Sequence, residues 1–457
     1  MNALLDAFIA HRERLDRGGL PQSVADSVRT FVIDSLAVGI AGAAAPLTAT
    51  IRRTARQWGK AGPSPLFGPA SGSLDPCSAA FVNGFQIHCQ EFDCVHEAAV
   101  VHPMATVFAA LTADCAARDA PVDGDRFAKA VALAVDVAVT LGVAARSPIR
   151  FFRPANAGLF GAVMGLSFIR RLTDDQIRDA MGYALSFNAG TMQPHVEGKP
   201  ALPVQIGHAA RSAIMATDLA EAGMPGAHDS LEGPYGYFAL FETQTDLSDL
   251  ASSLGECWRI AEVSHKPFPT GRAAHGGIAL MQELRANGVG PDDVLSIDLE
   301  APPLIQRLVG REVTAGMSAN YARLCFPYVG AVALMRGDVA LHDFTETALT
   351  DPEIMAIGKR ITVTESEVAD PAAFVPQVLR AELVNGEVRE IRISNLHGTP
   401  NNPLANAAQR RKVEDCIAFA YGRPEPGLAQ ELWAMSASLE TLHDINQLTR
   451  IAGGACP

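Results

Sequence analysis

The amino-acid sequence predicts a mainly α fold: a large all-helical domain and a smaller α+β domain. Hydrophobic residues make up 48% of the chain and aromatic residues only 6%, and Ala, Val, Leu and Gly gather in stretches that favour close-packed helices. Apolar residues recur at helical spacing from Asn2 to about Asp249. Strand-like alternation is confined to residues 294–394. A chain of 457 residues has room for two or three domains.

The first half of the chain predicts a series of packed helices. Residues 127–145 are apolar on nearly every face, which is typical of a helix buried among other helices. Thr173 and Gln176 have the spacing of a capping box, which begins a helix over 174–185. A further helix is expected over 211–222, where the glycine that follows ends it.

The pattern changes near residue 263. A helix is still expected over 273–286, but residues 294–300 and 361–366 alternate as strands do. Residues 378–394 predict a hairpin, in which Asn385-Gly386 would occupy the left-handed central positions of a type I′ turn.

Helical patterns return near the C-terminus, so the predicted helical domain is discontinuous. It comprises residues 1–262 and 401–457, and the α+β domain comprises residues 263–400. The returning helices are expected over 413–420, 428–438 and 442–448.

Charge and composition exclude several classes of function. The chain has 37 Lys and Arg against 50 Asp and Glu, a net charge of −13, and so lacks the basic field that nucleic acids and anionic membranes require. Its uncharged runs fall short of the roughly 18–20 strongly apolar residues of a membrane span. The eight cysteines form no C-x-x-C pair. We expect a cytoplasmic protein with no nucleic-acid or membrane partner. No dinucleotide-binding, Walker or G-x-S-x-G motif occurs.

The densest group of titratable residues lies in residues 88–102, with three histidines and three carboxylates. These groups are suited to acid–base catalysis, although a solvated loop whose histidines cap helices would explain them equally well. His96-Glu97 begins like a zinc-protease motif. His102 follows too late, however, because on a helix the two imidazoles would point roughly 240° apart. No metal is therefore expected.

Three other polar segments stand out. Residues 150–156 place two arginines before a helix, either as a carboxylate clamp or as surface residues. Residues 188–199 form a long polar loop, which a surface loop explains better than a functional one. Residues 265–275 bring Lys266, Arg272 and a histidine to the predicted domain junction, where small-molecule clefts form.

Several motifs, in this order, resemble the MmgE/PrpD family over almost the whole chain, from about residue 5 to 450. This family includes 2-methylcitrate dehydratase, cis-aconitate decarboxylase and iminodisuccinate epimerase. The resemblance implies a helical domain with an α+β lid, a cofactor-free site in the cleft between them, a homodimer, and proton transfer at a carbon next to a carboxylate. The motifs are Glu91-Phe92-Asp93, His102-Pro103, residues 231–236, Lys266-Pro267-Phe268-Pro269 with His275, and residues 322–328.

The chain departs from the common family pattern at informative positions. Asp93 is followed by Cys94 where an Asp is usual, and Arg153 stands in place of a catalytic histidine. Leu202 and Gln205 replace a lysine and a histidine, with only Lys199 close by. A dehydratase must protonate a departing hydroxide, whereas an epimerase needs only a base, an acid and cations that hold the carboxylates.

The resemblance and its departures predict epimerisation of a small anionic polycarboxylate, as in iminodisuccinate epimerase, without a cofactor. A dehydratase of the 2-methylcitrate type and a non-catalytic binding or assembly protein remain alternatives. The expected catalytic residues are His102, Lys266, Tyr328, His275 and Asp93, and the expected substrate-binding residues are Arg153, Lys199, Arg272, Glu91 and His96.

Overall fold

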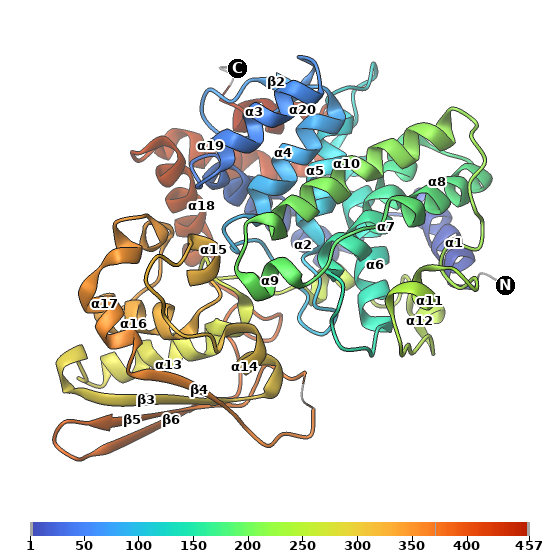
Figure 1. The fold of residues 1–457 in the computed structure, drawn as a ribbon. Helices are drawn as coiled ribbons and strands as arrows, with labels where there is room; N and C mark the ends of the chain where they lie inside the picture. Colours follow the sequence, from blue (N-terminus) through green and yellow to red (C-terminus); the bar gives the residue numbers. More distant parts are fainter. Residues whose placement is uncertain (1–2, 371, 455–457) are drawn as a thin grey trace.

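The computed structural model describes residues 3–370 and 372–454 and contains a large helical domain and a smaller domain built on a sheet (Figure 1). The predicted fold class is confirmed. The two large apolar cores of the described residues correspond to the two domains, beside one small cluster of Ala45, Phe85 and Cys89. The elements of the helical domain up to residue 253 are α1 (Ala3–Arg17), α2 (Gln22–Gly42), α3 (Thr48–Trp58), β1 (Ser64–Pro65), β2 (Ser73–Leu74), α4 (Pro76–His88), α5 (Pro103–Cys115), α6 (Gly124–Ala144), α7 (Arg153–Arg170), α8 (Asp174–Phe187), α9 (Gln193–Glu197), α10 (Ala201–Glu221), α11 (Tyr237–Phe241) and α12 (Leu250–Ser253).

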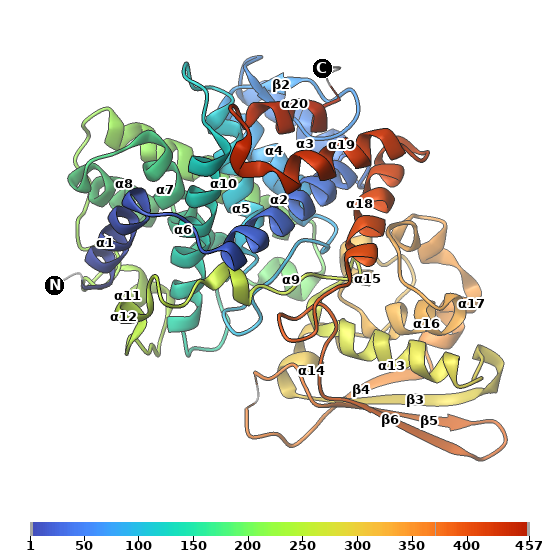
Figure 2. The ribbon, with the colours of Figure 1, turned by 180° about the vertical axis from the view of Figure 1, so that it is seen from behind.

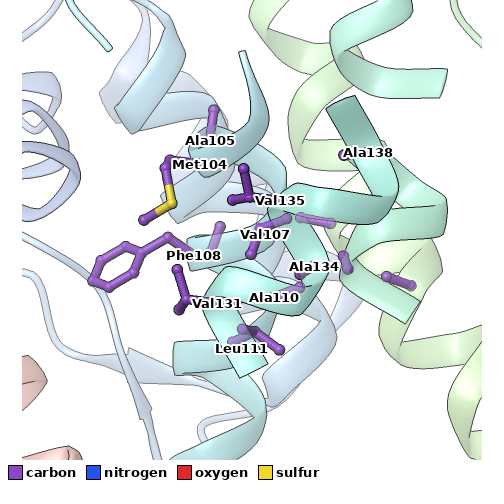
Figure 3. Packing of buried hydrophobic residues seen from close by; sticks show 14 of the residues in the cluster. Met104, Ala105, Val107, Phe108, Ala110, Leu111, Val131, Ala134, Val135 and Ala138 are labelled. Carbon is purple, nitrogen blue, oxygen red and sulfur yellow. The ribbon is translucent and has the colours of Figure 1, made fainter. Parts of the chain in front are cut away.

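Small side chains let the central helices approach closely. Figure 3 shows Ala105 and Ala110 of α5 and Ala134 and Ala138 of α6 interleaved with valine, leucine and phenylalanine side chains. On α7, a Cβ atom at Gly161 would lie 2.4 Å from the carbonyl oxygen of Ala134, so any larger residue there would push α7 away from α6. The abundance of alanine is therefore a property of this helix packing.

Several predicted helix boundaries agree with the structure. Both hydrogen bonds of the capping box between Thr173 and Gln176 are present at the start of α8. The helix predicted from residue 211 begins ten residues earlier, as α10, because Pro203 lies in its first turn, where proline is tolerated.

Among the described residues, only α6 is long and apolar enough to cross a membrane, and 89% of its apolar segment is buried inside the protein.

The last three helices pack on the first part of the chain. Buried residues of α18 (Asn406–Tyr421), α19 (Pro426–Ala437) and α20 (Asn446–Ala452) belong to the same apolar core as α2, α5 and α6. Figure 2 shows α18 and α19 running alongside α2, with α18 reaching down to the smaller domain. The helical domain is therefore built from both ends of the chain.

The smaller domain, called the lid below, has a four-stranded sheet in the order β4-β3-β5-β6. Strand β3 pairs in parallel with β4 and antiparallel with β5, and β5 pairs antiparallel with β6. Helices α13 and α16 lie along one face of the sheet (Figure 1). The elements are α13 (His275–Ala286), β3 (Val294–Ala301), α14 (Pro303–Val309), α15 (Ala319–Ala322), α16 (Phe326–Arg336), α17 (Pro352–Gly358), β4 (Ile361–Glu365), β5 (Gln377–Leu383) and β6 (Val388–Ile393).

The β5–β6 hairpin exists, but the predicted type I′ turn is wrong. Of the two residues of Asn385-Gly386, only Gly386 is left-handed, with a φ of 85°. The N–H of Gly386 donates to the carbonyl of Leu383, so Val384 and Asn385 are the central residues of the turn. Gly386 follows them in the bulge position of a longer hairpin loop, which also requires positive φ.

Candidate active site

A cavity lies between the helical domain and the lid. Residues of both domains line it, and small-molecule sites commonly form at such domain junctions. Most of its wall is apolar, and its polar side chains are three histidines, one glutamate and one arginine. The lining residues are His88, Glu91, Val95, Val100, His102, Ile149, Phe152, Pro154, Met192, His195, Leu202, Gly271, Arg272, Ala273, Leu308, Val309, Leu324 and Phe374.

Two of the histidines share one carboxylate. His88 ends α4, and His102 stands immediately before Pro103, which begins α5. Oδ2 of Asp93 lies 3.1 Å from Nδ1 of each ring, and the two rings meet edge to face with centroids 4.9 Å apart. The carboxylate of Asp93 is fully buried and accepts from both rings, which fixes the orientation of both imidazoles.

The environment separates the protonation states of these groups. Burial alone would raise the pKa of Asp93, but the two histidines hold it well below its ordinary value. Burial lowers the pKa of His102 and outweighs the opposing charge of Asp93. Burial would lower the pKa of His88 too, but the charges of Asp93 and Glu91 outweigh it and raise that pKa. A neutral His102 therefore stands beside a more readily protonated His88.

The same three groups could also hold a metal ion. One ligand atom from each of His88, Asp93 and His102 lies within 4.8 Å of the others. The 3.1 Å contacts are equally those of hydrogen bonds between each imidazole and a shared carboxylate. Sequence reasoning rejected a zinc site on His96 and His102 and did not consider this set.

Glu91 and Lys266 form a buried ion pair beside the cavity. The ammonium of Lys266 donates to the backbone carbonyl of Glu91 at 2.9 Å and lies 3.2 Å from its Oε2. Burial would raise the pKa of Glu91, but Lys266, with the two histidines, lowers it to about 2. Glu91 lines the cavity, whereas Lys266 lies behind it and is fully buried. Glu91 also has a φ of 52°, which turns the chain sharply at this point.

A second lysine fixes the backbone around this pair. Nζ of Lys412, on α18, donates to the carbonyls of Phe92 at 2.9 Å and of Lys266 at 3.0 Å, and it lies 2.6 Å from Oδ1 of Asp34. His265 shares the same Asp34 oxygen at 2.9 Å. One side chain of α18 therefore joins the loop of residues 89–97 to the segment that leads into the lid. The sequence offered no sign of this role.

Arg272 reaches the cavity from the lid with one donor unpaired. Its Nε is 2.6 Å from Oε1 of Glu97, and its Nη1 donates to the carbonyl of His397 at 2.8 Å. Nη1 also lies 3.2 Å from Nδ1 of His275, whose Nε2 is 3.3 Å from the carbonyl of Thr270. Burial and the charge of Arg272 hold the pKa of His275 well below its ordinary value. Nη2 of Arg272 is buried without a hydrogen-bond partner.

His195 lines the cavity, although sequence reasoning did not select it. It lies on the short helix α9, within the polar loop that was interpreted as a surface feature. Burial and the charge of Arg311 lower its pKa to about 4, so its ring is neutral near pH 7. The residue selected from this loop, Lys199, is exposed and lies outside the cavity wall.

Besides Asp93, Lys266 and His275, whose contacts are given above, four more expected site residues lie outside the cavity wall, and two of these four are held by other partners. Arg153 is buried, and its Nε and Nη2 each lie 3.2 Å from a carboxylate oxygen of Glu242. The Tyr328 hydroxyl donates to the carbonyls of Asp343 and Ala348 inside the lid core. These partners explain why neither side chain serves the cavity.

The other two lie apart from each other: His96 is buried and Lys199 is exposed. His96 faces a separate groove and lies 3.0 Å from Glu262. Leu202, where the family commonly has a lysine, supplies apolar wall to the cavity, and Gln205 donates to the carbonyl of Thr191. The positions that depart from the family pattern therefore add no acid or base to the cavity.

Comparisons with known proteins agree with this architecture. Cis-aconitate decarboxylases of Mus musculus and Homo sapiens are each 24% identical to the chain, over 99% and 100% of its length and 94% and 96% of theirs. A cis-aconitate decarboxylase-like protein of Aspergillus oryzae is 23% identical over 95% of the chain and 94% of its own length. The models of the MmgE/PrpD N-terminal and C-terminal domains match residues 9–250 and 268–435. The chain therefore belongs to the MmgE/PrpD family.

Proposed function

We propose that the protein catalyses cofactor-independent proton transfer at a carbon next to a carboxylate of a small di- or polycarboxylate. The observation that carries the proposal is the pairing of two groups on one apolar cavity. His102 is a neutral imidazole held by Asp93, and Arg272 has a buried, unpaired Nη2. The first is suited to remove a proton, and the second is suited to bind a carboxylate.

The chemistry follows from the protonation of His102. Because Asp93 is ionised, Nδ1 of His102 carries the hydrogen, and Nε2 of the neutral ring is free to accept a proton. Nε2 takes the proton from the carbon, and the electron pair of the C–H bond moves into the adjacent carboxylate. Arg272 stabilises the resulting enediolate, and the apolar walls strengthen that interaction. His275 is a positioning residue, since it acts only through Arg272.

We favour epimerisation, in which the proton returns to the opposite face of the same carbon. Its support is that Arg153 and Leu202, at the positions of a family histidine and lysine, provide no further acid in the cavity. His195 is the candidate at the second face, because it comes from α9, a different part of the wall from His102. Its ring is neutral near pH 7, so the proton that it passes to the carbon is first taken from solvent.

A lyase reaction is the second candidate. The raised pKa of His88 provides a protonated imidazole beside His102, which could protonate a departing hydroxide or the carbanion left by loss of CO₂. The three relatives, two cis-aconitate decarboxylases and one decarboxylase-like protein, favour the same class. Lys266 and Glu91 hold the loop of Asp93 in either case.

The deciding experiment follows iminodisuccinate, 2-methylcitrate and cis-aconitate in deuterium oxide by proton NMR. Epimerisation replaces the α-hydrogen by deuterium and interconverts stereoisomers, whereas a lyase releases water or CO₂. His102→Asn should abolish the reaction, and His342→Asn, whose side chain is 71% exposed on the lid, should leave it unchanged. If none of the three substrates exchanges hydrogen or is consumed, the proposal of catalysis fails.

A further inference from the structure

A second hollow adjoins the catalytic cavity and is called the outer groove here. It shares Ile149, Met192, His195 and Leu308 with the cavity, so these four residues form the boundary between the two hollows. Val196 at its rim is 68% exposed. One wall belongs to α9 and its surroundings in the helical domain, and the other to α14 and the residues that follow it in the lid. In Figure 1, α9 lies on the side of the helical domain that faces the lid. The full lining is Ile149, Met192, His195, Val196, Gln306, Arg307, Leu308, Gly310 and Arg311.

The outer groove carries positive charge without compensation from its own walls. Arg307 and Arg311 are its charged residues, and no Asp or Glu is among the described residues that line it. Arg307 is exposed. The mouth of the catalytic cavity is therefore cationic in a protein whose net charge is −13.

Arg311 is held in place by contacts within the protein, but one of its hydrogen-bond donors has no partner. Its Nη2 donates to the carbonyl of His195 at 3.1 Å, and its guanidinium lies over the ring of Tyr321, 4.9 Å from the centroid. Its Nη1 is buried without a hydrogen-bond partner. The anchoring contacts hold the guanidinium at the groove and leave donors for an anion.

We propose that the outer groove is an anion-capture subsite, through which a di- or tricarboxylate enters the catalytic cavity. This proposal rests on the proposed function and deepens it by assigning the entry route. Arg307 and Arg311 bind the carboxylates at the mouth, and the substrate then passes Met192 and Leu308 to reach Arg272 and His102. A local positive field raises the association rate of an anion even when the molecule as a whole repels it.

The test measures citrate binding by titration calorimetry at several NaCl concentrations, because exposed charges are screened by salt. Arg307→Glu should weaken citrate binding by about tenfold at low salt and reduce its dependence on salt. The matched control is Arg389→Glu on β6, where the side chain is 48% exposed and pairs with Glu387. A wild-type protein that binds no citrate, or an Arg307→Glu variant that behaves as the control does, would overturn the proposal.

The experiment separates the subsite from the reaction. Citrate binding requires no turnover, so the effect of Arg307→Glu should persist in a His102→Asn background. If citrate binding depends on Arg307 but no substrate exchanges hydrogen, the subsite is retained and the catalytic proposal is rejected. Where turnover is observed, Arg307→Glu should raise KM and leave kcat unchanged, since the groove lies outside the reacting atoms. A fall in kcat alone would reject the entry role.

Discussion

Nδ1 of His102 lies 3.1 Å from Oδ2 of Asp93, and this contact fixes which nitrogen of the imidazole can act as a base. Asp93→Asn preserves the shape of the side chain but lets an amide donate to Nδ1, which moves the ring hydrogen to Nε2. We expect kcat to fall by about a thousandfold. Hydrogen exchange into substrate measures the effect, and thermal unfolding checks that the variant is folded. Wild-type kcat in a folded variant would show that His102 is not the base.

Activity should persist to a lower pH than a catalytic base with the ordinary histidine pKa would allow. Burial lowers the pKa of His102, so the ring stays neutral as the pH falls below about 6.5. The profile of kcat/KM against pH should therefore remain flat through this region and decline only at lower pH. A limb centred above pH 7 would assign the base to another group.

Separating the buried pair of Glu91 and Lys266 should destabilise the protein. Glu91→Gln leaves the ammonium of Lys266 buried without its counter-charge, at a cost of about 3 kcal/mol. Adding Lys266→Met should recover part of this loss, because no buried charge then remains. Chemical denaturation of the single and double variants measures both effects. Additive losses in the double variant would contradict the coupling.

The same pair should contribute to acid sensitivity. The pKa of Glu91 is lowered to about 2 from an ordinary value of about 4.5. A carboxyl group with a depressed pKa stabilises the fold fully above its unfolded value and loses that contribution as the pH falls through the folded value. The stability difference between wild type and Glu91→Gln should therefore be constant above pH 5 and shrink between about pH 4.5 and 2. A difference that grows on acidification would reverse the assignment.

Removal of divalent metals distinguishes the two interpretations of His88, Asp93 and His102. As a base, His102 needs Nδ1 bonded to Asp93 and not to a cation, so EDTA treatment should leave activity unchanged. Added Zn²⁺ should inhibit, because the three ligand atoms lie within 4.8 Å of one another. Loss of activity in EDTA with recovery on adding a metal would identify this cluster as a metal centre.

The sequence predicted the local parts of the site better than the parts that depend on tertiary contacts. Glu91, Asp93 and His102 are close in the chain, and their clustering in residues 88–102 was visible before folding. Arg153 shows the opposite case. Its partner, Glu242, lies 89 positions away, and nothing in the pattern around Arg153 reveals that its charge is already taken. The fold class followed from the periodicity of apolar residues along the sequence, and the packed alanine-rich helices of the structure follow the same periodicity.

The polar loop before α10 shows a further limit. His195 and Lys199 are four positions apart, and charge favours the lysine as a ligand for anions. Gly198, with a φ of 62°, ends α9 between them, so the histidine turns inward and the lysine remains in solvent. The turn at Gly198 and the contact of Arg311 with the His195 carbonyl decide which side chain enters the cavity. Neither can be predicted from the composition of the loop.

The contacts of Lys412 also bear on how the protein matures during synthesis. Every described residue that lines the cavity between the domains precedes position 375, yet the carbonyls of Phe92 and Lys266 are bound by a side chain on α18. A nascent chain that has exposed all its cavity residues still lacks the cation that joins these two backbone segments. The geometry around Glu91 and Lys266 is therefore completed only after α18 has left the ribosome.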